Sequence, residues 1–138
     1  MAMNEDRLYT KIAWRLIPFI TTLYIFNFLD RVNVGFAALT MNADLGFSPA
    51  VFGFGAGILS IGYAAFQVPA NVMLERMGAR RWICTIMLIW GTLSAMNAFV
   101  QSPTQFYVLR FLLGAAESGF VPGIFYYLTV WFPPSYRA

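Results

Sequence analysis

The sequence predicts an all-α membrane protein with four transmembrane helices. The chain of 138 residues is 59% hydrophobic and 11% charged, whereas an ordinary soluble domain is about 25% charged. Four apolar segments are each long enough to cross a bilayer, which takes about 20 helical residues. They cover residues 14–39, 51–74, 82–100 and 104–131. Because the connections between them are short, successive helices are expected to be antiparallel neighbours.

The first segment is apolar except for an acid and a base side by side, Asp30 and Arg31. It is too long for a cleaved signal peptide, so we expect it to be retained. A turn that contains Gly46 and Pro49 separates it from the second segment. The second segment ends before Gly78, which allows a tight turn into the third. Only the tripeptide "QSP" separates the third segment from the fourth.

The basic residues outside the spans all fall on one side of the predicted membrane. They are Arg7, Lys11, Arg15, Arg76, Arg80, Arg81 and Arg137. The two loops on the opposite side contain no Lys or Arg. Because Lys and Arg are in excess in cytoplasmic loops, we expect both ends of the chain to lie in the cytoplasm. This distribution explains the net charge of +3 without a nucleic-acid partner, and the expected partner is the lipid bilayer.

Four ionisable residues remain inside the spans: Asp30 and Arg31 in the first, and Arg110 and Glu117 in the fourth. Each such charge costs about 2.5 to 3.5 kcal/mol on insertion scales, and such groups usually mark ion paths, proton relays or substrate contacts. Burial and a nearby arginine act in opposite directions on a carboxyl group, so Asp30 and Glu117 are candidates for proton exchange near neutral pH. An arginine in the same cavity offers a planar fork that suits a carboxylate. The residue types indicate a proton carrier beside an anion clamp.

The polar residues of the first and fourth spans each share one helical face. Asn27, Asp30 and Arg31 fall within about 120° on a helical wheel. Arg110 and Glu117 are two turns, or about 10 Å, apart along one face. Asn27 is a candidate substrate contact, although hydrogen bonding between helices explains a buried amide at least as well.

The second span carries a polar stripe in which Tyr63, Gln67 and Asn71 recur every four residues. For the two amides, structural hydrogen bonding between helices is again at least as good an interpretation as ligand binding. Three small-residue pairs predict close helix packing. They are Gly53 with Gly57 in the second span, and Gly114 with Ser118 and Gly119 with Gly123 in the fourth.

Four short blocks of sequence extend over almost the whole chain. They are "LDRVN" at 29–33, "GYAAFQVPAN" at 62–71, "LERMGARRW" at 74–82 and "RFLLGAAESGFVPG" at 110–123. In this order they resemble the major facilitator superfamily of transporters. The third block departs from the superfamily's loop motif by having Asn71 for its first Gly, Glu75 for its Asp and Ala79 before the arginine pair. Those departures resemble one branch of the superfamily, the anion:cation symporters of organic anions.

The resemblance implies roles for the polar residues of the spans. Arg31 would contact an anionic substrate, and Asp30 and Glu117 would carry the coupling proton. Arg110 would belong to the same polar network. The other residues implied to line the site are Tyr63 and Gln67, and those implied to act in a cytoplasmic gate are Glu75, Arg76, Gly78, Arg80 and Arg81.

The resemblance also implies a larger molecule. Transporters of this superfamily have twelve helices in two halves and hold the substrate between the halves. Residues 1–138 would be part of the amino-terminal half, with the first four helices, and the missing carboxy-terminal helices would be their partners. The implied location is the bacterial cytoplasmic membrane.

The expected function is symport of an organic anion with protons, without any cofactor beyond the coupling protons. Sugar acids, dicarboxylates and aromatic acids remain open as substrates. Two alternatives are a truncated membrane fragment that does not transport, and a small four-helix transporter completed by oligomerisation. Arg31 beside Asp30 disfavours the cationic substrates that many small exporters carry. An enzyme is not expected, because the chain has no His and no nucleophile placed beside a base, and no metal site is expected either.

Overall fold

The computed structural model describes residues 2–132, and within this range it contains helices and no strand. The helices are α1 (Ala2–Leu45), α2 (Pro49–Met77), α3 (Ala79–Met96), the 3₁₀ helix η1 (Asn97–Phe99), α4 (Pro103–Glu117) and α5 (Phe120–Trp131). Four stretches of these helices are long and apolar enough to span a membrane, which confirms the predicted fold class. Arg137, which contributed to the predicted orientation, lies outside the described residues.

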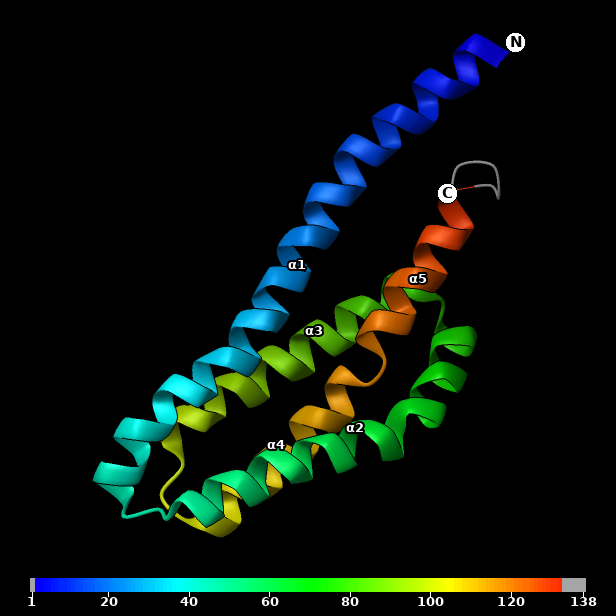
Figure 1. Cartoon of the computed structure of the whole chain (residues 1–138). Coiled ribbons are helices and arrows are strands. Elements are labelled where there is room, and N and C mark those ends of the chain that lie inside the picture. Colours follow the sequence, from blue (N-terminus) through cyan, green and yellow to red (C-terminus); the bar gives the residue numbers. More distant parts are fainter. Residues whose placement is uncertain (1, 133–138) are drawn as a thin grey trace.

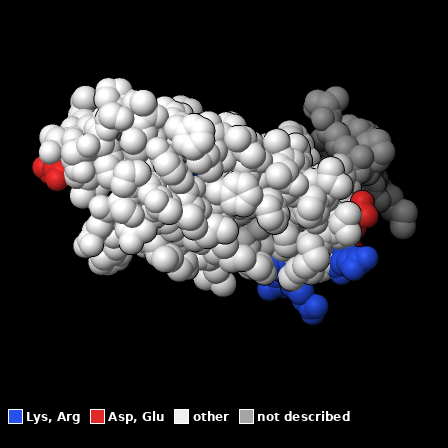
Figure 2. Space-filling view, turned by 90° about the horizontal axis from the view of Figure 1, so that it is seen from below, with Lys and Arg blue, Asp and Glu red and all other residues white. Residues whose placement is uncertain are grey.

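The helices run alternately up and down (Figure 1). The start of α1, the turn between α2 and α3 and the end of α5 lie toward one end of the molecule. The turn between α1 and α2 and the connection from α3 to α4 lie at the other end. Figure 2 shows basic side chains only toward one end of the visible face, next to a long uncharged surface. Many large apolar side chains of the spans are exposed, among them Phe19, Phe54 and Leu88, as expected of helices that face lipid.

Two Ser-Pro pairs begin the helices that leave the end opposite the basic side chains. Oγ of Ser48 accepts a hydrogen bond of 3.3 Å from the backbone N–H of Val51, and Pro49 is the first residue of α2. Ser102 and Pro103 repeat this arrangement at the start of α4. Proline is suited to the first helical position because that residue's N–H has no partner inside the helix. Both helices therefore begin at residues that the sequence interpretation had assigned to turns.

A single residue, Gly78, connects α2 to α3. Its φ is +78°, in a region that L-residues with a side chain rarely adopt. Its N–H donates to the carbonyl oxygen of Leu74 at 2.9 Å, and its own carbonyl oxygen accepts from the N–H of Trp82 at 3.1 Å. The tight turn predicted at this glycine is present.

The sequence predicts one continuous helix over residues 104–131. The structure instead has two helices there, α4 and α5. The span is broken between Glu117, the last residue of α4, and Phe120, the first residue of α5. Pro122 explains the break, because proline has no N–H to offer the carbonyl oxygen four residues earlier and its ring collides with that carbonyl. At the break, Nε1 of Trp82 donates to the carbonyl oxygen of Gly119 at 3.3 Å. The apolar character of the span hides this interruption from a hydropathy window.

Two glycines allow α2 and α4 to pack with their backbones in contact. A Cβ atom added to Gly114 would collide with the carbonyl oxygen of Leu59, and one added to Gly62 would collide with the carbonyl oxygen of Phe111. Among the predicted small-residue pairs, close contact is confirmed at Gly114 and also at Gly119, where an added Cβ would meet Trp82. The prediction is wrong for Gly53 and Gly57, which both face open space in the described structure.

Two apolar clusters lie on either side of a polar layer. One contains Phe47, Val100, Phe106 and Leu109, and the other contains Ile86, Phe120 and Ile124. Along α1, residues 20 and 23 pack on the second cluster and residues 34, 41 and 45 pack on the first. The stretch between them contains Asn27, Asp30 and Arg31. The fold thus holds the polar residues of α1 between two apolar contacts.

Candidate functional site

The centre of the polar layer is an ion pair between α1 and α4. Nη2 of Arg31 lies 2.6 Å from Oε2 of Glu117, and Nε of Arg31 donates to the same oxygen at 2.8 Å. The side chain of Glu117 is 1% exposed and that of Arg31 is 46% exposed. The second carboxylate oxygen, Oε1, has no hydrogen-bond partner among the described residues. Glu117 therefore keeps one oxygen available to accept a proton.

Asp30 is next to Arg31 in the sequence but contacts a different helix. Its Oδ2 accepts a hydrogen bond of 3.3 Å from Nε1 of Trp90, and its Oδ1 accepts one from Oγ of Ser94. Both donors belong to α3. Consecutive residues of an α-helix point about 100° apart, because a turn takes 3.6 residues. Thus α1 contacts α3 through one charged residue and α4 through the next.

Arg110 on α4 has no acidic partner among the described residues. It is 4% exposed, and its guanidinium carbon lies 5.3 Å from the ring centre of Phe106. Its Nε donates to no acceptor in the described chain. A buried guanidinium that lacks an acceptor is energetically unfavourable, so this group is available to an anion.

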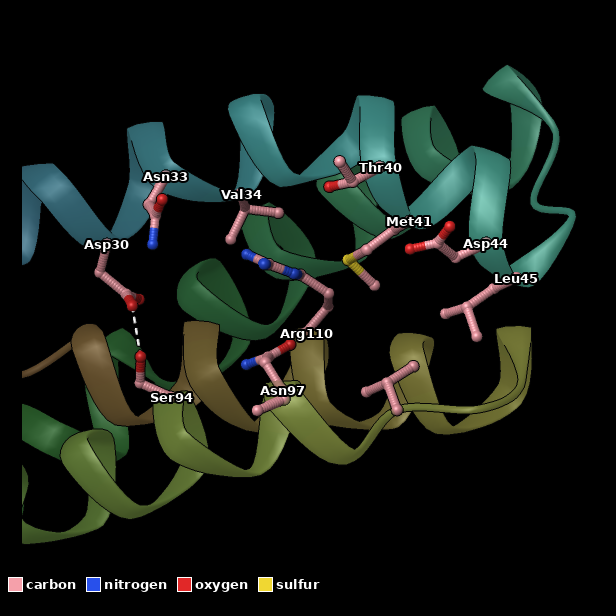
Figure 3. A pocket seen from close by; sticks show the side chains of 12 residues that line it. Asp30, Asn33, Val34, Thr40, Met41, Asp44, Leu45, Ser94, Asn97 and Arg110 are labelled. Carbon is pink, nitrogen blue, oxygen red and sulfur yellow. Dashed lines mark hydrogen bonds between the residues drawn. The ribbon is translucent and has the colours of Figure 1, made fainter.

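The Arg110 side chain borders two cavities. The first has a volume of about 450 Å³ and is also lined by Asp30 and Asp44. Figure 3 shows Arg110 projecting from α4 toward Val34 of α1, between these two aspartates, while Asp30 turns toward Ser94. The second cavity has a volume of about 220 Å³ and lies between α1, α2 and α4. It is lined by Arg31 and Arg110, and no acidic residue is among the described residues of its wall.

The structure brings some of the remaining predicted residues to the ion pair. The ring centre of Tyr63 lies 5.6 Å from the guanidinium carbon of Arg31. Asn27 is buried, and together with Trp90 and Glu117 it lines a narrow void. Gln67 is exposed on α2, and no hydrogen bond joins it to the other predicted site residues in the described chain. Of the two predicted contacts on α2, only Tyr63 reaches the charged centre.

The residues predicted for the gate lie at the turn between α2 and α3. Gly78 makes the turn itself. The charged members are exposed: Glu75, Arg76, Arg80 and Arg81. They are therefore separate from the buried charges of the polar layer.

Sequence reasoning missed the two donors of α3, Trp90 and Ser94. They are ordinary residues for a transmembrane helix, and only their contact with Asp30 distinguishes them. The two residues are four positions apart and so lie on the same face of α3. This shared face was the sequence pattern that could have indicated them. No group of three His, Cys, Asp or Glu side chains that could hold a metal lies among the described residues.

A family model and several curated relatives match this chain, and they agree with one another. The family model described as Major Facilitator Superfamily matches residues 20–138. A protein of Agrobacterium vitis named as a tartrate transporter is 59% identical over 97% of this chain and 30% of its own length. The metabolite transport protein NicT of Pseudomonas putida, so named, is 59% identical over 94% of this chain and 30% of its own length. A quinolone resistance transporter of Acinetobacter baumannii is 47% identical over 99% of this chain and 31% of its own length.

The chain therefore spans about 30% of the length of these curated relatives. The names of the matched family and of these relatives are those of transporters and not of enzymes. No solved structure matches the chain.

Proposed function

The chain belongs to the major facilitator superfamily, and on that premise we propose that residues 1–138 form part of the amino-terminal half of a proton-coupled organic anion symporter. The chain is an integral membrane segment with four spans. The proposed location is the bacterial cytoplasmic membrane, with the basic end of the bundle in the cytoplasm. The remaining helices of the transporter would complete the substrate site.

The observation that carries the proposal is the ion pair of Arg31 and Glu117. While Glu117 is ionised, it neutralises the only acid-paired arginine of the described polar layer. A proton on the free oxygen Oε1 removes the charge of the carboxylate. Arg31 then has no anionic partner, and its planar fork is available to a carboxylate of the substrate. In this way binding of the proton prepares binding of the anion.

The balance of charges inside the spans also supports movement of the proton and the anion together. The four charges inside the spans, Asp30, Arg31, Arg110 and Glu117, sum to zero. An anion that entered alone would leave a net negative charge at membrane depth, which is unfavourable. One proton taken up for each carboxylate keeps the sum at zero. Movement of proton and anion together therefore costs less free energy than movement of either one alone.

The names of relatives support an organic anion as the substrate. Two proteins of Agrobacterium vitis, each 59% identical to this chain, are named as tartrate transporters. The sequence blocks that resemble the anion:cation symporter branch lead to the same class. Arg31 is the proposed substrate contact, with Tyr63 and Asn27 beside it, and Asp30 and Glu117 are the proposed proton carriers.

The test is proton-driven uptake by the complete protein in liposomes. Tartrate accumulation is measured with an acidic exterior and with equal pH on both sides, and alkalinisation of the exterior is followed with a pH dye. We expect the gradient to raise accumulation roughly tenfold and a protonophore to abolish the increase. Uptake that does not respond to the gradient, for tartrate and for a panel of sugar acids and aromatic acids, would contradict the proposal.

A further inference from the structure

The 220 Å³ cavity between α1, α2 and α4 has an unusual lining. Among the described residues that line it, the charged ones are Arg31 and Arg110. The rest of its wall is apolar or small: Val34, Gly35, Phe52, Ala56, Leu59 and Phe106. Both guanidinium groups border this cavity, so it presents two planar forks that suit carboxylates, one of them neutralised by Glu117 while that residue is ionised.

The two arginines differ in what neutralises them. Arg31 has two contacts with Glu117. Arg110 is buried at 4% exposure, lies over the ring of Phe106, and has an Nε without an acceptor in the described chain. Arg110 can therefore receive a carboxylate without release from an acidic partner. Once Glu117 is neutral, Arg31 becomes available to the same cavity.

We propose that, once Glu117 is protonated, this cavity binds a small dicarboxylate, with Arg110 taking one carboxylate and Arg31 the other. The inference rests on the proposed symport function and names the substrate class of that site. Each guanidinium group presents a planar fork that matches one carboxylate. The volume of 220 Å³ corresponds to about seven water molecules at ~30 Å³ each, and its apolar wall suits a short carbon chain.

The charges inside the spans also determine how many protons should accompany a dicarboxylate. A dianion that joins the four charges inside the spans, which sum to zero, needs two protons to keep that sum. Glu117 takes one of them. Asp30, which lines the neighbouring cavity beside Arg110, is the second carboxylate available. Transport of a dicarboxylate is therefore expected to be electroneutral, with two protons for each substrate molecule.

The experiment compares two ligands that differ in one carboxylate. Tartrate and threonate share a chain of four carbons, and threonate has a hydroxymethyl group where tartrate has its second carboxylate. Equilibrium binding of each is measured at acidic pH on the complete purified protein. We expect tartrate to bind about tenfold more tightly, which corresponds to 1.4 kcal/mol. Arg31→Gln should remove this preference, and Arg110→Gln should weaken both ligands by about tenfold or more.

Three controls separate charge from folding. Arg15→Gln removes an exposed positive charge of α1 outside the site and should leave both affinities unchanged. Arg110→Lys keeps the charge and loses the fork, so its affinity should lie between those of the wild type and Arg110→Gln. Elution of each variant as a single monodisperse peak reports that it is folded.

The outcomes distinguish this inference from the proposed function. Equal binding of tartrate and threonate by the wild type, or unchanged binding after Arg110→Gln, would overturn the two-arginine site. If proton-driven uptake of a monocarboxylate persisted in that case, the symport function would stand. If the complete protein took up no carboxylate with protons, the proposed function itself would fail, and this inference with it.

Discussion

Arg31 directs two nitrogen atoms at one oxygen of Glu117, at 2.8 Å and 2.6 Å, and leaves the other oxygen of that carboxylate without a hydrogen-bond partner among the described residues. This asymmetry matters because a proton that binds at Oε1 meets no competing hydrogen-bond donor among the described residues and leaves both contacts of Oε2 in place. Here the proton can arrive first, and the ion pair can weaken afterwards. The order of these two events is what coupling requires.

The first prediction concerns Glu117→Gln. The amide cannot exchange a proton, and it leaves Arg31 without an anionic partner. We expect accumulation driven by a pH gradient to fall by roughly tenfold or more, while exchange of labelled for unlabelled tartrate across the membrane continues. Both are measured with the complete protein in liposomes. Loss of exchange together with accumulation would show that Glu117 is needed for binding and not for coupling.

The second prediction concerns the hydrogen bonds from α3 to Asp30. Trp90→Phe removes the indole N–H that donates to Oδ2. We expect it to lower the free energy of unfolding of the complete protein by about 1.5 kcal/mol, since a hydrogen bond to a charged group is lost. Thermal unfolding of the detergent-solubilised protein measures the change. Trp14→Phe is the matched control, because Trp14 is 77% exposed.

Ser94→Ala removes the other donor to Asp30 and should be destabilising in the same way. Because both donors contact one carboxylate, the effects of the two substitutions are expected to be non-additive in the double variant. Simple addition of the two effects would indicate that Trp90 and Ser94 act through packing and not through Asp30.

The third prediction tests the contact between α2 and α4. A methyl group at position 62 or 114 would collide with a backbone carbonyl of the facing helix, which cannot move aside as a flexible side chain can. We expect Gly62→Ala and Gly114→Ala each to cost about 1 to 3 kcal/mol of stability. Gly53→Ala and Gly57→Ala make the same chemical change where the described structure has open space. If all four variants unfolded alike, the close approach of the helices would be refuted.

The fourth prediction concerns the turn at Gly78, where φ is +78° and ψ is 149°. This backbone conformation is essentially restricted to glycine, so Gly78→Ala should cost about 1 to 3 kcal/mol. The control is Gly91→Ala in the middle of α3, where nothing lies within 4 Å of an added Cβ. That change should be neutral or stabilising by about 0.5 to 1 kcal/mol, because alanine favours the helix. Equal melting temperatures for the two variants would argue against the strained turn.

The sequence was sufficient for the membrane class because hydropathy is a property of whole segments. It was also sufficient for Gly78, since a glycine between two apolar helices has few other uses. It was not sufficient for the break after Glu117. Transmembrane helices often tolerate a proline, because neighbouring groups satisfy the freed carbonyl. Whether Pro122 interrupts the helix thus depends on groups such as the Trp82 indole, which reaches Gly119 from another helix.

The sequence was likewise not sufficient to tell which acid of the site contacts which base. The sequence pointed to Asp30, Arg31, Arg110 and Glu117, but each acid had two candidate bases, and no spacing rule chooses between them. The choice comes from the rotation of α1, which turns Asp30 toward α3 and Arg31 toward α4. Trp90 and Ser94 became part of the site only through that rotation. The functional roles of these residues stay predictions until the variants are measured.

The distance along the chain between Arg31 and Glu117 has a consequence for biosynthesis. The two residues are 86 positions apart, and a ribosome adds about 5 to 20 residues per second. Arg31 therefore leaves the ribosome roughly 4 to 17 s before its partner exists. During this interval α1 has to be held by the insertion machinery, or at the edge of the bilayer, with its charges hydrated. The first helix to be made is thus expected to be among the last to settle into the bundle.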